Sequence, residues 1–239
     1  MKQEAKPKVQ GDGIAGGDLG EIHAITLSDG VHHQIITGQE LRSLHRLRNK
    51  RLRWFQKRIS RTQKGSKNRF RLYQKKQQFL DKIHRKMEYL LHCISKMAVD
   101  WCMEHGVTTL YIGNPHGVQL HTKNTRRVSR KVRQKLSNWS FGWLIKLIEY
   151  KAHLHGITVK CIEEAYTSGT CPSCGIYSKQ QGRTFSCPHC GATGHRDVIG
   201  VVNIREKGQT GELTGGRDIP SWKDTTYRRV RWKTHQAVA

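Results

Sequence analysis

The chain has 239 residues, and its 43 Lys and Arg against 18 Asp and Glu give a formal net charge of +25. So many positive charges repel one another in the compact state, and the phosphates of nucleic acid would neutralise them. Nucleic acid is therefore favoured as a partner over an anionic membrane or a merely soluble surface. No apolar run approaches the roughly 18 residues of a membrane span and no secretory segment opens the chain, which argues against a membrane protein and predicts a cytoplasmic location.

The N-terminal part predicts a disordered leader followed by a β-hairpin. Residues 1–13 are polar and rich in Lys, Gly and Pro. Apolar residues between Leu19 and Leu27 predict a strand whose start is bent by glycines, and the turn residues 28–30 lead into a second strand over 31–36. These strands begin an α/β domain over residues 14–38. The nearby His23, His32 and His33 are interpreted as polar surface residues, because nothing requires them to be ligands.

Residues 39–105 predict a basic helical hairpin inserted in that domain. Apolar residues recur at helical spacing from Gln39 to about Ile59, Gly65 and Ser66 interrupt the pattern, and a second apolar stripe runs from Leu80 to Trp101. The many Arg and Lys side chains fit either an arm along a nucleic-acid backbone or a solvated helical pair. The large excess of one sign favours the arm.

The second half predicts the rest of a mixed sheet flanked by helices. A buried strand over 107–112 ends at Gly113-Asn114-Pro115, a basic loop covers 121–135, a helix covers 139–155, and a further strand covers 157–162. Residues 106–165 are therefore interpreted as the second part of the domain and 195–205 as its last part, and the order of elements predicts an α/β fold. The polar residues 206–239 are interpreted as a basic flexible tail.

Four cysteines form the sharpest motif in the chain. Cys171-Pro-Ser-Cys174 and Cys187-Pro-His-Cys190 are separated by twelve residues, and each pair is followed by glycine. Two such knuckles supply four thiolates to one tetrahedral zinc, so residues 166–194 predict a structural zinc ribbon; a redox disulfide pair is the rival interpretation. His189 is interpreted as an exposed residue and not as a fifth ligand.

Acidic residues lie on both sides of this ribbon. Glu163 and Glu164 end the strand before it, Asp197 begins the apolar segment after it, and Asp18 lies where the glycine-bent strand begins. Carboxylates at strand ends can converge on two divalent ions that activate a water for phosphodiester cleavage. The alternative is that these are solvated charges or, for Asp197, a helix cap.

Four segments carry a resemblance to a known family: AGGDLGEIHAITLSDG, YIGNPHGV, CIEEAYTSGTCPSCG and FSCPHCGATGHRDVIGVVNI. In order and content they resemble the RuvC-like half of TnpB (OrfB-type) proteins, the transposon-encoded RNA-guided DNA nucleases related to type V CRISPR effectors. The resemblance runs from about Ile14 to Ile204. It implies an RNase H-like (RuvC-like) mixed sheet, with DNA and guide RNA as partners and a role in transposition.

The same resemblance assigns residues. Asp18 and Asp197 match the first and third catalytic aspartates of the family, which hold Mg²⁺, and the four cysteines match the zinc ribbon of its target-nucleic-acid-binding region. The usual second acid falls at Gly113-Asn114, where neither residue carries a carboxylate, so Glu164 is the expected substitute. The implied activity is an Mg²⁺-dependent DNA endonuclease with Asp18, Glu164 and Asp197 as its acids.

The N-terminal side also departs from the family pattern. Family members carry a recognition region before the first aspartate, whereas seventeen residues precede Asp18 here. This predicts impaired handling of the guide and a truncated or split protein. Two functions follow as alternatives: an RNA-guided nuclease or its truncated remnant, and a catalytically inactive nucleic-acid-binding protein of repressor-like or decayed transposon origin.

Overall fold

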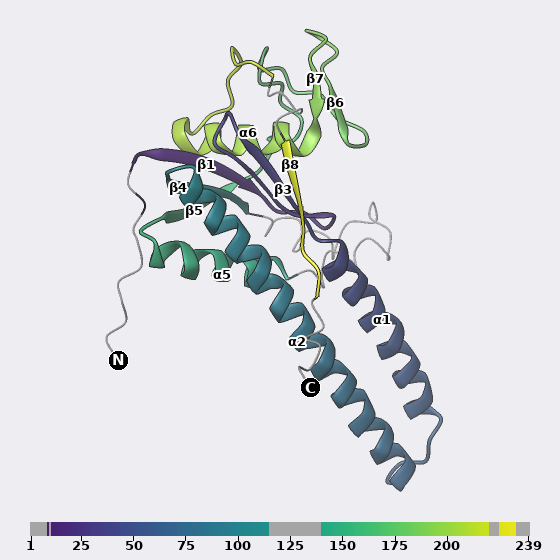
Figure 1. Ribbon diagram of the computed structural model, residues 1–239. Helices are drawn as coiled ribbons and strands as arrows, with labels where there is room; N and C mark the ends of the chain where they lie inside the picture. The colour runs from purple at the N-terminus through teal and green to yellow at the C-terminus, as the bar shows by residue number, and fades with distance from the viewer. Residues whose placement is uncertain (1–8, 10, 115–139, 220–224, 233–239) are drawn as a thin grey trace, which may run out of the picture.

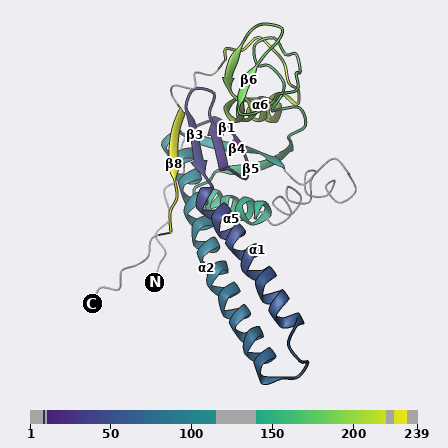
Figure 2. The same cartoon turned by 90° about the vertical axis from the view of Figure 1, so that its right-hand side faces the viewer.

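A six-stranded sheet lies between two helical layers in the computed structural model, which describes residues 9, 11–114, 140–219 and 225–232 (Figure 1). Helix α6 (Arg196–Thr210) covers one face of the sheet, and α2 (Lys67–Glu104) and α5 (Phe141–Leu154) cover the other (Figure 2). The predicted mixed sheet flanked by helices is therefore confirmed. No helix within the described ranges is long and apolar enough to cross a bilayer.

The strands follow the order β5-β4-β1-β2-β3-β8 across the sheet. The pairs β5-β4, β4-β1 and β3-β8 are parallel, whereas β1-β2 and β2-β3 are antiparallel. The six strands are β1 (Gly13–Asp18), β2 (His23–Ser28), β3 (His33–Thr37), β4 (Val107–Asn114), β5 (Thr158–Glu163) and β8 (Thr225–Arg229).

The glycine-rich segment before Asp18 is a full strand, which the sequence did not predict. Three strands occupy the region where two were expected, and Asp18 ends β1 instead of beginning a strand. A Cβ on Gly16 would lie 2.3 Å from the carbonyl oxygen of Val201 on α6. Close packing of the helix against β1 therefore requires glycine here, and this packing outweighs the poor strand propensity of glycine.

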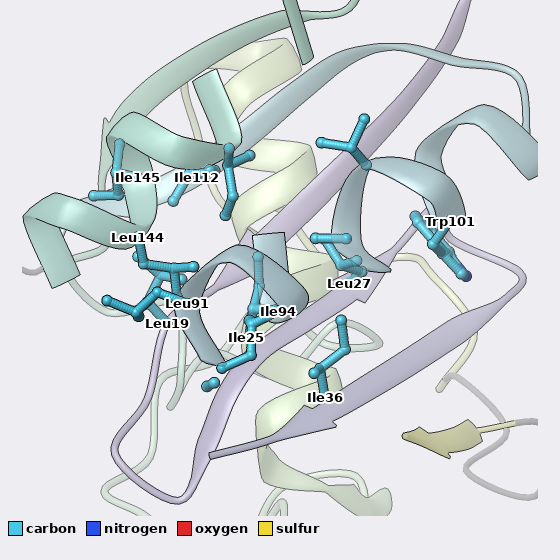
Figure 3. Close-up of a cluster of buried hydrophobic side chains, with 14 of the residues drawn as sticks. Leu19, Ile25, Leu27, Ile36, Leu91, Ile94, Trp101, Ile112, Leu144 and Ile145 are labelled. Atoms are coloured by element: carbon cyan, nitrogen blue, oxygen red, sulfur yellow. The ribbon is translucent and has the colours of Figure 1, made fainter. Parts of the chain in front are cut away.

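The main hydrophobic core lies between the sheet and the α2/α5 layer (Figure 3). Ile25 of β2, Ile112 of β4 and Leu144 of α5 are at most 1 % exposed, and Leu91 and Ile94 of α2 pack among them. The apolar stripe read in the sequence over the C-terminal half of α2 is the part of the helix that enters this core. These contacts fix β2 and β4 against the two helices.

Helix α1 (Gln39–Ser60) and α2 form an antiparallel pair that projects away from the sheet (Figures 1 and 2). Helix α2 begins at Lys67, well before the predicted stripe, and the Ser66 hydroxyl caps it by accepting from the Arg69 amide at 3.2 Å. No residue of α2 is buried before Ile83. We call this pair of helices, Gln39–Glu104, the arm.

Two terminal regions differ from the sequence interpretation. Gly13, expected in the leader, already pairs with Val107 in the sheet. In the expected tail, α6 continues to Thr210 and β8 pairs with β3. The exposed Thr, Tyr and Arg side chains of β8 made this segment look unstructured, but an edge strand tolerates them. The basic loop expected over 121–135 lies outside the described residues.

Candidate functional site

Three parallel strands end at the same edge of the sheet. Gly17 of β1 pairs with Ile112 of β4, and Asn114 at the end of β4 pairs with Glu163 at the end of β5. Asp18 is the last residue of β1, and Glu164 directly follows β5. The carboxyl ends of parallel strands are where open α/β sheets gather their functional groups.

Helix α6 brings Asp197 to this edge from the other side of the ribbon. Asp197 lies in the first turn of α6, where the helix dipole favours a negative charge. Gly113 leaves room for Glu164, because a Cβ there would lie 3.0 Å from Glu164 Oε2. Gly200 lies beside Asp18, where a Cβ would make an ordinary contact of 3.7 Å with Oδ2. We call Asp18, Glu164 and Asp197 the acidic edge.

The three carboxyl groups have different electrostatic environments. Burial raises the pKa of Asp18 to about 8, and the negative charges of Glu164 and Asp197 add to this effect. Burial also raises the pKa of Glu164. For Asp197 burial acts in the same direction, but the hydrogen bond from His23 and the neighbouring cationic groups outweigh it and hold the pKa below its ordinary value. Carboxylates that repel one another in a partly buried site are stabilised by a bound cation.

A cleft of about 530 Å³ opens beside Asp18 and Asp197. Its walls include His23, Arg183 and Arg196. His23 Nδ1 lies 2.6 Å from Asp197 Oδ2, and Arg183 donates to the same oxygen at 3.4 Å. These residues were missed as site residues because His23 and Arg183 lie 174 and 14 positions from Asp197, and no spacing motif links them.

The four cysteines of the two knuckles come together as a cluster. The Sγ atoms of Cys171 and Cys190, and those of Cys174 and Cys187, lie 3.6 Å apart, and all four lie within 4.8 Å of one another. Sulfurs bound tetrahedrally to zinc at about 2.3 Å lie about 3.8 Å apart, so the cluster can hold zinc. Backbone N–H groups of Cys190 and His189 lower the pKa of Cys187 to about 6, which favours the ligating thiolate.

Each knuckle turns at a glycine. Gly175 and Gly191 both have a φ of +72°, and their amides donate to the carbonyls of Cys171 and Cys187 at 2.9 and 3.1 Å. The left-handed backbone explains why glycine follows each Cys-x-x-Cys pair. The strands β6 (Thr184–Ser186) and β7 (Thr193–His195) form an antiparallel hairpin that leads to α6.

Helix α6 links this cluster to the acidic edge. Ile199 packs against Cys171, Cys187 and Phe185. The fully buried Asn203 donates to the carbonyls of Thr167 and Thr170 at 2.7 and 2.8 Å. Since the Thr167 hydroxyl donates to the Glu164 carbonyl at 2.8 Å, Asn203 fixes the segment that follows Glu164. The sequence offered Asn203 only as part of a family motif, without this role.

The segment after α6 also packs on the knuckles. The amides of Gly216 and Arg217 donate to the carbonyls of Ser173 and Pro172 at 2.7 and 3.1 Å. Arg217 forms an ion pair with Glu206 and donates to Asn203 Oδ1 at 3.2 Å. Residues expected in a flexible tail therefore help to hold the cysteine cluster on α6.

Two family models match the chain. The model described as "Probable transposase" (OrfB_IS605) covers residues 1–119, and the model described as "Cas12f1-like, TNB domain" covers residues 141–204. The matched residues include all three acids of the acidic edge and all four cysteines.

Curated relatives agree with the family models. A TnpB-like protein of Methanocaldococcus jannaschii, MJ0751, is 31% identical over 126 residues, covering 52% of this chain and 44% of its own length. The TnpB-like protein ORF457 of Acidianus two-tailed virus is 28% identical over 213 residues, covering 86% and 43%. The CRISPR-associated endodeoxyribonuclease Cas12f1 of Syntrophomonas palmitatica is 28% identical over 148 residues, covering 61% and 27%. The chain thus spans less than half the length of these relatives.

Solved structures show the same fold. The cryo-EM structure of a CRISPR-Cas12f ternary complex matches with a TM-score of 0.65 at 17% identity, covering 86% of this chain and 40% of that one. That of a Cas12f1–sgRNA–target DNA complex matches with a TM-score of 0.59 at 19% identity, covering 83% and 51%. The resemblance drawn from the sequence is confirmed: the chain belongs to the TnpB (OrfB-type) family.

Proposed function

We propose that this chain is the nuclease part of a transposon-associated, RNA-guided DNA endonuclease that hydrolyses phosphodiester bonds with Mg²⁺ held by the acidic edge. The observation that carries the proposal is the convergence of Asp18, Glu164 and Asp197 from three distant segments. Glu164 and Asp197 lie close enough to Asp18 that their charges add to the effect of burial in raising its pKa. Random surface carboxylates do not share a partly buried site that penalises their charge. The division of the domain into residues 14–38, 106–165 and 195–205 belongs to the same proposal.

The residues of the acidic edge fit magnesium. They offer only carboxylate oxygens, which Mg²⁺ prefers, and a divalent ion would offset both the burial and the repulsion that raise the pKa of Asp18. Bound there, such ions would activate a water and stabilise the leaving oxygen. Glu164 takes the place of the acid missing at Asn114, which ends the neighbouring strand.

The remaining cleft residues orient the acids and receive the substrate. His23 fixes the direction of the Asp197 carboxylate through its 2.6 Å contact. Arg183 and Arg196 line the cleft and present cationic groups to a phosphate. The solvent-exposed Arg183 guanidinium can leave Asp197 for a phosphate oxygen, because their 3.4 Å contact is long for a charge-assisted bond.

Zinc in the four-cysteine cluster would stabilise the ribbon on α6. All four ligand positions are filled by sulfur, so no position remains for a reacting water, and the role is structural. Loss of zinc would loosen the contacts of Ile199 with Cys171 and Cys187 and, through α6, the position of Asp197.

The arm would bind the backbone of nucleic acid. It carries 19 Lys and Arg against 5 Asp and Glu, and most of these cations are exposed. Such a surface binds phosphates without reading sequence, so base pairing with a guide RNA would supply the specificity.

The test is cleavage of labelled single-stranded DNA and of DNA paired with a guide RNA, at low salt, with the zinc-loaded protein. Wild type is compared with Asp197→Asn, with and without Mg²⁺. We expect cutting that requires Mg²⁺ and is lost in the variant, while binding to the same DNA remains. Tight binding by wild type with no cutting under any of these conditions would overturn the proposal and leave a nucleic-acid-binding protein.

A further inference from the structure

The cleft holds a second cluster of ligand groups, which shares only Asp197 with the acidic edge. His23 begins β2, His195 ends β7, and Asp197 lies in the first turn of α6. Each of the three offers one ligand atom, and these atoms lie within 4.8 Å of one another. The fold therefore brings two imidazoles and a carboxylate together from widely separated parts of the chain.

One atom of this cluster lacks a partner. His195 Nδ1 is buried and has no hydrogen-bond partner within the described residues, although a buried polar nitrogen normally has one. The rings of His23 and His195 lie 5.8 Å apart between centroids, close enough for both to face one small ligand. An ion between the two rings would satisfy the unpaired nitrogen and the Asp197 carboxylate together.

A cation already occupies part of this space. The Arg183 guanidinium lies 3.3 and 3.4 Å from the two nitrogens of the His23 ring and 3.4 Å from Asp197 Oδ2. Its side chain is 46 % exposed and comes from the ribbon, so it can swing into solvent. The position therefore favours a positive charge, and a metal ion can take the place of the Arg183 guanidinium.

We propose that His23, His195 and Asp197 form a binding site for one transition-metal ion of the Co²⁺, Fe²⁺ or Zn²⁺ type. Two imidazoles and one carboxylate are a donor set of these ions, whereas Mg²⁺ prefers oxygen ligands alone. The site is separate from the four cysteines, and its existence does not require that the chain cut DNA. This site shares Asp197 with the acidic edge. The metal ions bound in the cleft therefore depend on which divalent ions are present in solution.

The probe is Co²⁺, added by calorimetric titration to protein that carries one zinc per chain, without Mg²⁺ or nucleic acid. His23→Gln and His195→Gln each remove one donor, and His153→Gln removes an exposed imidazole from α5 as the matched control. We expect one Co²⁺ per wild-type chain, affinity at least roughly tenfold weaker in each cleft variant, and no change in the control. Arg183→Gln should bind Co²⁺ more tightly, since it removes the competing cation.

The variants are compared at equal zinc content and equal helical circular dichroism. A measurement on wild type alone covers the case in which a variant does not fold: Co²⁺ should shift the imidazole NMR signals of His23 and His195 by its paramagnetism, and Mg²⁺ should not. Equal Co²⁺ affinity in wild type and both cleft variants would overturn the proposal. So would a Co²⁺ affinity that Asp18→Asn weakens more than either histidine variant, because the ion would then belong to the acidic edge.

Discussion

The acidic edge and the arm carry opposite charge and are stabilised in different ways. At the acidic edge, α6 lies so close to β1 that Gly16 has no room for a Cβ, and three carboxyl groups share a partly buried site. On the arm, α2 buries nothing before Ile83 and its cations face solvent. Packing therefore determines the geometry of the first region, and charge determines what the second can bind. The two regions should fail separately when changed.

The largest expected effect comes from the acidic edge. Asp18→Asn should lower Mg²⁺-dependent cleavage at least roughly a thousandfold, because several kcal/mol of transition-state stabilisation depend on a bound ion. Single-turnover cleavage measures this loss, and a gel-shift titration on the same DNA should give a dissociation constant within about threefold of wild type. Equal loss of binding and of cutting would mean that the two regions are not independent.

The arm should give the reverse result. Replacing Lys50, Lys57, Arg71 and Lys75 by Gln should weaken DNA binding roughly tenfold to a hundredfold and reduce the slope of log affinity against log salt by up to about 3.6. Cleavage of DNA that is already bound should keep its rate. Replacing the exposed Gln56, Gln74 and Gln78 by Ala is the control on the same helices, and an equal weakening there would point to helix stability instead of charge.

A smaller effect tests the link between the ribbon and the acidic edge. Asn203→Ala removes the hydrogen bond from Arg217 and the two that Asn203 donates, and it leaves the buried carbonyls of Thr167 and Thr170 unpaired. We therefore expect a loss of about 1–3 kcal/mol in the free energy of unfolding. Thermal unfolding measures this as a lower Tm. The exposed Asn68→Ala on α2 should change stability by less than about 0.5 kcal/mol. Equal Tm values for the two variants would show that Asn203 does not have this structural role.

The last effect concerns pH. In zinc-loaded protein free of Mg²⁺, Asp18 has a folded-state pKa of about 8, above its ordinary value of 3.8. The folded state then binds the proton more tightly than the unfolded state, so the free energy of unfolding falls as pH rises from about 4 to about 8. Asp18→Asn cannot ionise and should be more stable than wild type at pH 8 by on the order of several kcal/mol, with the difference vanishing near pH 4. A constant difference across this range would contradict the raised pKa.

Sequence patterns predicted the parts of this molecule whose signals are local. The spacing of Cys171, Cys174, Cys187 and Cys190 predicted the cluster, and the apolar stripe of α2 predicted the helical pair. Strand β1 was not predicted, because its glycines are required by packing against a helix almost two hundred residues away. Strand β8 was not predicted, because an edge strand needs no apolar run.

The candidate site shows the same division. A family motif singled out Asp18 and Asp197, and Glu164, at the end of the strand before the ribbon, was the expected substitute for the second acid. The contact between His23 and Asp197 spans 174 residues and leaves no trace in local spacing, so His23 was interpreted as a surface residue. In the structure it is a partly buried wall of the cleft, and His33 is buried with its Nδ1 2.9 Å from the Ser28 hydroxyl.

Glu164 is proposed to supply the carboxylate that Asn114 lacks, and the two adjacent acids Glu163 and Glu164 allow a direct test. Glu164 is partly buried beside Gly113, whereas Glu163 is exposed at the end of β5. Mg²⁺-dependent cleavage should be abolished by Glu164→Gln and retained by Glu163→Gln, although both remove one negative charge from the same strand end. If Glu164→Gln still cuts while Asp18→Asn does not, Glu164 is not the second acid of the site.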